Sequence, residues 1–320
     1  MTRIADLLAA GKTWSFEFFP PRSDAEQATL TRTLHDLEPL GPSFVSVTYR
    51  GSAASRRRTY EVVTAMLHVT RLTPMAHLTC VGHTRLELAE ILVEYRKAGV
   101  VNLMALGGDP LATAEDGQGE LAHAFELVQL ARAIGGFSIG VAAHPAGHPA
   151  SADLDTDRAH LAEKLELADF AITQFFFEAE QYRGLVEDLA RRGLTKPVLP
   201  GIMPVTSLAS IPRMAEMGSP VPRWAQARLQ AAAETGGDDA VRAEGIAMAT
   251  ELCRDVLELG APGLHFYTLN RSTATREIYR SLGLSPTPQP DVPGTPSVSS
   301  AALSVGDGRI TAAARTGSGW

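Results

Sequence analysis

Residues 14–40, WSFEFFPPRSDAEQATLTRTLHDLEPL, contain the unit that decides the fold. Four of the first six residues are aromatic, which is typical of a buried β-strand. From Asp24 onward the apolar side chains recur at helical spacing, and Ser23 stands where an N-cap oxygen would satisfy the first free backbone N–H groups. Gly41 follows where the helix would end. This stretch predicts one strand and one amphipathic helix.

The same unit recurs along the chain. Counting the first, eight runs are predicted to be strands: residues 14–19, 44–49, 75–80, 102–106, 137–143, 170–176, 198–203 and 264–269. The clearer helices are predicted at residues 24–40, 55–72, 84–98, 120–134, 155–167 and 178–192, with Thr84 and Asp155 as further N-caps. The longer connection before the last strand is expected to hold helices near 207–217, 222–233 and 238–259.

Eight strand–helix units over residues 14–282 are close to the ~250 residues of a closed (β/α)8 barrel. The rival is a doubly wound open sheet, which would show fewer strands and a glycine-rich first turn. Neither G-x-G-x-x-G nor G-x-x-x-x-G-K-[ST] occurs in the sequence. We therefore predict an α/β protein with a single TIM barrel over residues 1–284.

The rest of the chain differs in composition. Residues 285–320 are rich in Pro, Ser, Gly and Thr and have few large apolar side chains. Such a segment buries too little apolar surface to offset the entropy lost on ordering. We expect a disordered or loosely docked tail.

Composition excludes several classes of function. Lys and Arg total 29 against 36 Asp and Glu, which gives a net charge of -7 and argues against binding to nucleic acid or to an anionic membrane surface. Two cysteines cannot form a disulfide framework, and neither a signal sequence nor an apolar run of membrane-spanning length is apparent. We expect a cytoplasmic protein.

In a barrel, chemistry takes place at the carboxyl ends of the strands. Polar residues do fall at the ends of the predicted strands: Glu17, Thr48, Tyr49, His77, Thr79, Asp109, His144, His148, Gln174, Tyr267, Asn270 and Arg271.

Glu17 stands out, because Phe16, Phe18 and Phe19 surround it. Desolvation in such a place would raise the pKa of the carboxyl group, so that it could hold a proton near neutral pH. The plain alternative is a solvent-facing Glu17, or one paired with Arg22.

The other polar residues also have structural alternatives. Asp109 precedes a proline and could be a turn residue, and Gln174 could be a buried amide satisfied by the backbone. His144 and His148 are spaced like a metal-binding pair on a helix, but the prolines and the glycine among them forbid a helix, so no metal site is predicted. Two residues of the next helix, Asp157 and Lys164, would ordinarily belong to a solvated face.

Eight strand-end motifs together resemble the methylenetetrahydrofolate reductase family. They occur in the family's order and roughly its spacing, and they cover residues 13–283: SFEFFPPRS, FVSVTYR, AHLTC, ALGGDP, AAHPAGHP, AITQFFF, PGIMPV and HFYTLNR. The resemblance implies a TIM-barrel enzyme that reduces 5,10-methylenetetrahydrofolate to 5-methyltetrahydrofolate with NADH or NADPH.

The resemblance also implies roles for individual residues. Glu17 matches the general acid that protonates N10 of the folate, and Asp109 lies near the site of hydride transfer. Substrate contacts fall to Gln174 and Tyr267, and cofactor contacts to Thr48, His77, His144, His148, Asp157 and Lys164. Arg271 is a further candidate for substrate binding, because an acidic protein needs a local positive group to hold an anionic ligand.

The family uses FAD as a hydride carrier, but several positions that would hold the flavin differ here. The family's arginine after strand four is Gly107, its strand-five aromatic is His144, and its Gly-Ala after strand two is Arg50–Gly51. An expected tyrosine is Ala122, and an expected aromatic after strand seven is Leu208. Each lost ionic contact costs ~1.5 to 3 kcal/mol and each lost stacking contact about 1 kcal/mol.

These losses suggest that flavin is weakly bound or absent, and that NADH passes hydride directly to the folate. The alternatives are a conventional FAD-dependent ping-pong reductase, a flavin-dependent barrel that oxidises an amino acid, and a folate-binding protein without catalysis. The residue pattern leaves open the oligomeric state and the choice between NADH and NADPH. We expect NADH from the resemblance to bacterial members of the family.

Overall fold

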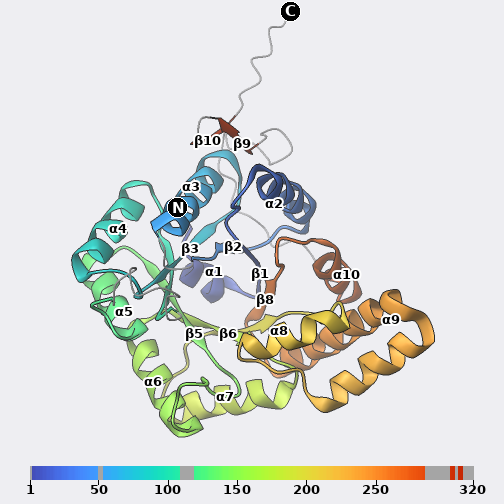
Figure 1. The fold of residues 1–320 in the computed structure, drawn as a ribbon. Helices are drawn as coiled ribbons and strands as arrows, with labels where there is room; N and C mark the ends of the chain where they lie inside the picture. Colours follow the sequence, from blue (N-terminus) through green and yellow to red (C-terminus); the bar gives the residue numbers. More distant parts are fainter. Residues whose placement is uncertain (1, 50–52, 109–118, 285–302, 307–308, 313–320) are drawn as a thin grey trace, which may run out of the picture.

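The computed structural model describes residues 2–49, 53–108, 119–284, 303–306 and 309–312. Eight parallel strands pair in chain order, and the last pairs with the first to close a barrel (Figure 1). The strands are β1 Thr13–Phe18, β2 Phe44–Val47, β3 Pro74–Thr79, β4 Asn102–Leu106, β5 Ser138–Ala143, β6 Phe170–Phe175, β7 Val198–Ile202 and β8 Gly263–Tyr267. The predicted fold and all eight predicted strands are confirmed.

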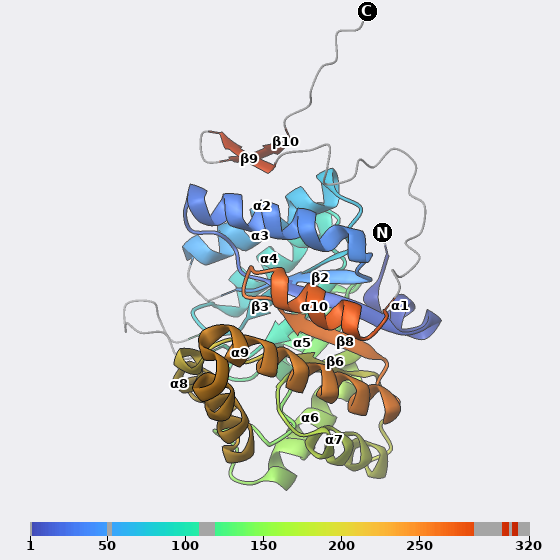
Figure 2. The same cartoon turned by 90° about the vertical axis from the view of Figure 1, so that its right-hand side faces the viewer.

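Helices surround the barrel on the outside (Figures 1 and 2). They are α2 Asp24–Leu37, α3 Ala53–Val69, α4 Arg85–Lys97, α5 Ala124–Ile134, α6 Leu154–Leu167, α7 Ala179–Arg191, α8 Ile211–Glu216, α9 Arg223–Glu258 and α10 Thr273–Ser281. Short 3-10 turns, η1 Glu38–Leu40 and η3 Leu208–Ser210, follow α2 and precede α8.

The helix starts show which predicted caps were right. Ser23 and Thr84 accept from the backbone N–H groups of Glu26 and Glu87, as predicted. The prediction for Asp155 was wrong, because α6 starts one residue earlier and Asp153 is its N-cap. Helix α5 begins at Ala124, later than the predicted residue 120.

Helix α9 is two helices joined at a sharp bend. Gly236 and Gly237 have non-helical backbone angles, with φ of -150° and 63°. Arg228 before the bend pairs with Glu244 and Glu251 after it, at 2.5 and 2.9 Å, so the two halves pack side by side. The predicted helices at 222–233 and 238–259 correspond to these halves.

A short helix that the sequence analysis did not predict, α1 Ile4–Ala10, closes the end of the barrel where the strands begin (Figure 2). Ile4 and Leu8 pack against a buried cluster inside the barrel that includes Phe44, Met75 and Phe170. The backbone N–H of Ile4 donates to Asn102 Oδ1 at 2.9 Å, and that of Ala5 donates to Ser138 Oγ at 3.0 Å. The helix is therefore a plug with both polar and apolar anchors.

Two short strands lie within the segment predicted to be a tail. β9 Leu303–Gly306 and β10 Arg309–Ala312 form an antiparallel pair, with β10 lying beside α3 (Figure 1). Composition did not predict them, although Val305, Ile310 and Thr311 are β-branched and favour strands. None of the helices in the described ranges is long and apolar enough to cross a membrane.

Candidate active site

Glu17 lies at the carboxyl end of β1, where β2, β3 and β8 supply its neighbours. Ser46 Oγ donates to Glu17 Oε2 at 3.3 Å, and His265 Nε2 lies 3.4 Å from the same oxygen. His77 Nε2 also lies 3.4 Å from Oε2, without the geometry of a hydrogen bond. The Glu17 side chain is only 13% exposed, whereas Arg22, the alternative partner, is exposed and its backbone N–H bonds to Glu26.

The neighbours of Glu17 oppose the effect of its burial. Burial raises the pKa of Glu17, but the positive potential of His77 and the contacts with His265 and Ser46 together bring the pKa below its usual value. Burial also lowers the pKa of His77, against the attraction of Glu17. The expectation of a raised pKa at Glu17 is therefore wrong for the free protein.

Three buried polar atoms near Glu17 have no hydrogen-bond partner among the described residues: Thr48 Oγ1, His77 Nε2 and Thr79 Oγ1. Side chains two residues apart on a strand share a face, so Thr48 lies on the face of Ser46 and Thr79 on the face of His77. Buried polar groups normally have partners. The ends of β2 and β3 thus present polar atoms that a bound molecule could satisfy.

Two of the predicted substrate contacts, Gln174 on β6 and Tyr267 on β8, are tied to backbone groups. Gln174 Nε2 donates to the Met217 carbonyl at 3.0 Å, and its Oε1 accepts from Phe175 N at 3.0 Å, which is the plain alternative considered for this residue. Tyr267 donates to the Thr173 carbonyl at 2.7 Å, and its ring fills the space beside Gly201. Burial raises the pKa of Tyr267, so its hydroxyl stays protonated.

The loop after β8 fixes the loop after β1. Asn270 accepts from Phe19 N at 2.8 Å and donates to Phe19 O at 3.0 Å, and Thr268 Oγ1 donates to Glu17 O at 2.6 Å. Leu269 and Asn270 have positive φ of 50° and 57°, a conformation that costs free energy unless the surroundings hold it. Arg271 follows this loop and is exposed.

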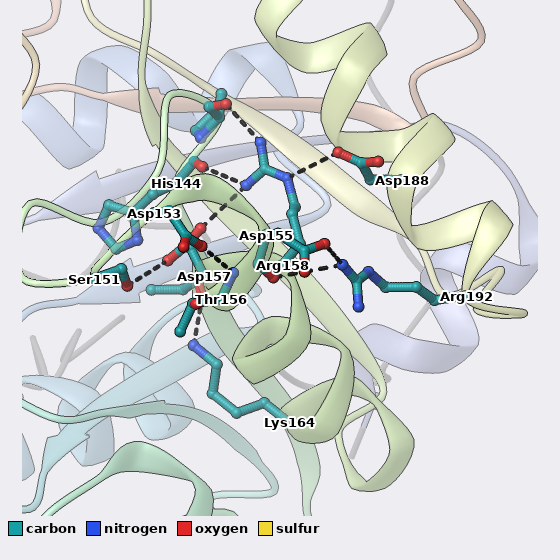
Figure 3. A network of polar contacts seen from close by, with 12 residues as sticks. His144, Ser151, Asp153, Asp155, Thr156, Asp157, Arg158, Lys164, Asp188 and Arg192 are labelled. Carbon is teal, nitrogen blue, oxygen red and sulfur yellow. Dashed lines mark hydrogen bonds and ion pairs between the residues drawn. The ribbon is translucent and has the colours of Figure 1, made fainter.

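A second group of predicted residues lies at the ends of β5 and the start of α6 (Figure 3). The rings of His144 and His148 meet edge to face, with centroids 4.6 Å apart, in a turn rather than a helix. Burial and then His148 lower the pKa of His144 to about 4. His144 is therefore an uncharged aromatic ring at neutral pH. The described residues contain no group of three or more His, Cys, Asp or Glu that could hold a metal ion.

Asp157 and Lys164, predicted to contact a cofactor, are not on a solvated face. Asp157 pairs with the buried Arg158 at 3.1 Å, and Lys164 Nζ donates to the Ala142 carbonyl at 3.1 Å (Figure 3). Burial lowers the pKa of Lys164, and the charge of Asp157 opposes this. Both side chains are thus built into the support beneath the strand-five loop.

Arg158 holds that loop in place. It is 1% exposed and donates to the carbonyls of His144 and Pro145 at 2.8 and 2.6 Å, while its Nε lies 3.6 Å from Asp188 Oδ2 (Figure 3). Sequence reasoning missed Arg158, although it shares the buried helix face of Leu161 and Leu165.

Sequence reasoning also missed residues of the Glu17 cluster. Ser15 and Glu17 are two apart on β1, as are His265 and Tyr267 on β8, so strand alternation was the signal for Ser15 and His265. Asp109, the second predicted catalytic residue, lies outside the described residues. Gly108 just before it has φ of +90°, and a Cβ there would lie 2.5 Å from Val81 Cγ1, so glycine is required.

A closed (β/α)8 barrel with a buried carboxyl–histidine cluster at the carboxyl ends of its strands defines a TIM-barrel enzyme. The methylenetetrahydrofolate reductase family model matches residues 3–283, and the chain belongs to this family of oxidoreductases. It is 33% identical to the 5,10-methylenetetrahydrofolate reductase of Pectobacterium carotovorum over 274 residues, covering 85% of this chain and 90% of that protein.

Further relatives agree. The Escherichia coli 5,10-methylenetetrahydrofolate reductase is 34% identical over 277 residues, covering 85% of this chain and 91% of that protein. A solved structure from Clostridium thermocellum, described as binding two copies of 5-methyl-5,6,7,8-tetrahydrofolic acid, has the same fold at a TM-score of 0.62 and 10% identity. The alignment covers 87% of this chain and 97% of that one.

Proposed function

We propose that this protein reduces 5,10-methylenetetrahydrofolate to 5-methyltetrahydrofolate with a reduced nicotinamide cofactor, and that Glu17 is the general acid. The observation that carries the proposal is the buried Glu17 at the barrel mouth, in contact with Ser46, His77 and His265. The family match and the methyltetrahydrofolate bound by the Clostridium thermocellum protein support a folate as substrate.

Glu17 supplies a proton to N10 of the folate. Protonation breaks the bond between N10 and the methylene carbon, which leaves an N5-iminium cation that accepts a hydride and becomes the N5-methyl group. Glu17 is left as a carboxylate and regains a proton from solvent. The bound folate excludes water from Glu17 and strengthens the effect of burial, which raises the pKa of its carboxyl group. The acid is then protonated in the complex.

The reduced nicotinamide supplies the hydride. The unpartnered polar atoms of Thr48, His77 and Thr79 support a polar ligand beside Glu17. Lys164, Asp157, His144 and His148 gather at the end of β5, two strands along the barrel from β3, and would hold the rest of that molecule. Asp109, Gln174, Tyr267 and Arg271 are assigned to the folate.

The residues present fit a tightly bound flavin poorly. Gly107 has no side chain, so the family's cation is missing at this position, although a Cβ there would meet nothing within 4 Å. Ala122 is exposed, and Leu208 packs in an apolar cluster with Met203 and Val205. His144 only partly replaces the family's aromatic ring, since its neutral imidazole is flat but smaller. These features favour direct hydride transfer in a ternary complex.

Glu17→Gln tests the general acid. We expect the rate of NADH oxidation that depends on methylenetetrahydrofolate to fall by ~10²- to 10⁴-fold, because an amide cannot donate the proton. Glu166→Gln, the same change on the exposed face of α6, is the matched control and should keep the wild-type rate. Near-normal folate reduction by Glu17→Gln would show that the acid lies elsewhere.

The absorbance spectrum of the purified protein tests the flavin proposal. A direct transfer predicts no stoichiometric flavin bands near ~450 nm and initial-rate lines that intersect when both substrates are varied. Stoichiometric flavin that bleaches with NADH, together with parallel lines, would establish the ping-pong alternative.

A further inference from the structure

The contacts of Glu17 fall on one of its two carboxyl oxygens. Ser46 Oγ, His77 Nε2 and His265 Nε2 all approach Oε2, at 3.3, 3.4 and 3.4 Å. Among the described residues, no hydrogen bond or ion pair of this side chain involves Oε1. The two oxygens are therefore in different surroundings, and a proton on Oε1 would meet no competing donor from the described part of the barrel wall.

His265 is the most enclosed of these neighbours. Its side chain is fully buried, its ring stacks on Phe44 with centroids 6.1 Å apart, and the edge of Tyr267 lies at 5.2 Å. Its other ring nitrogen, Nδ1, lies 2.8 Å from Ser15 Oγ. Both nitrogens of the ring are thus engaged, one by a carboxylate and one by a hydroxyl.

The two partners of His265 determine its tautomer. An ionised carboxylate can only accept, so Nε2 must carry the hydrogen that faces Glu17. In a neutral ring Nδ1 is then an acceptor, and the Ser15 hydroxyl is the donor within reach. The Leu264 carbonyl is the other acceptor near Ser15, but it lies at 3.3 Å, farther than Nδ1.

We propose that Ser15, acting through His265, is a positioning residue that anchors Glu17 Oε2 and leaves Oε1 to carry the proton to the folate. The inference rests on the proposed role of Glu17 as the acid. The proton on Oε1 moves to N10, and the negative charge that remains is held at Oε2 by the Nε2–H of His265 and the hydroxyl of Ser46. In this arrangement the Nε2–H of His265 faces Oε2 both before and after the proton is transferred.

Removing the Ser15 hydroxyl should weaken the hydrogen bond that the Nε2–H of His265 donates to the Glu17 carboxylate. With the ionised form less stabilised, Glu17 would lose its proton at higher pH. The alkaline limb of folate reduction should then move up by as much as ~1 pH unit, and the rate on the acidic plateau should fall several-fold because the acid is weaker. The other groups that face Glu17 are Ser46, His77 and Tyr267, and the substitution leaves them in place.

Ser15→Ala is compared with Ser138→Ala over pH 5 to 9. Ser138 is the matched control, since it is equally buried on a strand but bonds to Ala5 N at the other end of the barrel. We expect a shifted profile for Ser15→Ala and a wild-type profile for Ser138→Ala. A Ser15→Ala profile parallel to that of the wild type would overturn the proposal.

His265→Gln gives a second arm. A glutamine amide can donate to Glu17 without help from Ser15, so adding Ser15→Ala to His265→Gln should change the profile no further. Additive effects of the two substitutions would show that Ser15 acts independently of His265, contrary to the proposal.

Nitrogen-15 NMR of the imidazole rings provides a readout that does not depend on activity. The chain has nine histidines, and the His265 signals are assigned by their loss in His265→Gln. We expect the Nε2–H tautomer in the wild type and a mixture in Ser15→Ala. A wild-type Nδ1–H tautomer would overturn the inference even if Glu17→Gln is inactive, whereas an active Glu17→Gln with the expected tautomer would count against the acid alone.

Discussion

Glu17 shows how a single residue balances opposed influences. Burial favours its neutral form, while His77, His265 and Ser46 favour the carboxylate and prevail in the free protein. A flat ligand at the barrel mouth would remove water from the remaining 13% of the side chain. Substrate binding therefore changes the balance in the direction that proton donation needs.

This balance predicts a difference between two pH profiles. The alkaline limb of kcat/KM reports Glu17 in the free enzyme, and that of kcat reports it in the complex. We expect the limb of kcat to lie at higher pH, because desolvation by the folate raises the pKa of Glu17. Initial rates from pH 5 to 9 at varied folate check this, and coincident limbs would contradict it.

His144 predicts an effect of pH on stability. Its pKa is lowered from 6.5 to about 4 in the folded protein, so below pH 6.5 the unfolded chain takes up a proton that the folded protein does not. The contribution of His144 to the free energy of unfolding is present above pH 6.5 and is lost as the pH falls toward 4. The loss amounts to at most ~3 kcal/mol. In His144→Phe, the free energy of unfolding in urea should fall less steeply between pH 6.5 and 4. An unchanged slope would show that His144 titrates normally.

At the scale of elements, the loops after β1 and β8 form one unit. The side chain of Asn270 bonds to both the backbone N–H and the backbone carbonyl of Phe19. The two residues with positive φ, Leu269 and Asn270, give the loop its shape. The loop after β8 therefore sets the position in which β1 presents Glu17.

Asn270→Ala should disturb stability and activity together. Two hydrogen bonds are lost and a left-handed alanine is left, so we expect a loss of ~2 to 3 kcal/mol in the free energy of unfolding and a several-fold lower kcat/KM. Asn270→Asp keeps the acceptor for Phe19 N, so its stability and activity should lie between those of the wild type and Asn270→Ala. Urea unfolding and folate-dependent rates measure both effects, and a stable but inactive Asn270→Ala would mean that Asn270 contacts the substrate instead.

The strands and helices could be predicted because local sequence patterns decide them. The electrostatics of the site could not, because they depend on residues far apart in the sequence. Apolar runs and caps located the strands and helices, because strand burial and N-cap bonds depend on neighbouring residues. The pKa of Glu17 depends on His77 and His265, which β3 and β8 bring close only when the barrel is closed. Likewise α1 is too short to show a clear period, and its anchors lie on β4 and β5.

At the scale of the whole molecule, the two ends of the barrel have different tasks. The carboxyl ends of the strands carry Glu17, His77 and Tyr267, whereas the opposite end is closed by α1 through Ile4 and Leu8. Because of this division, a substitution at one end of the barrel can change stability while a substitution at the other end changes catalysis.

Ile4→Ala tests that separation. Ile4 is fully buried, so the substitution should lower the free energy of unfolding by ~2 to 4 kcal/mol. Because the plug lies at the end of the barrel away from Glu17, kcat and KM should stay within about two-fold of wild type. Lys12→Ala, an exposed change next to the plug, is the control for both measurements. A large loss of kcat in folded Ile4→Ala would show that the two ends are coupled.

The plug also has a consequence for the order of folding. Helix α1 is synthesised before the barrel strands, yet its polar anchors lie 98 and 133 residues further along the chain. Until β5 has been synthesised, the apolar face of α1 has no barrel to enter and remains available to chaperones or to other nascent chains. Closure over such long loops is a slow step, and we expect the plug to dock late, after the first strands have paired.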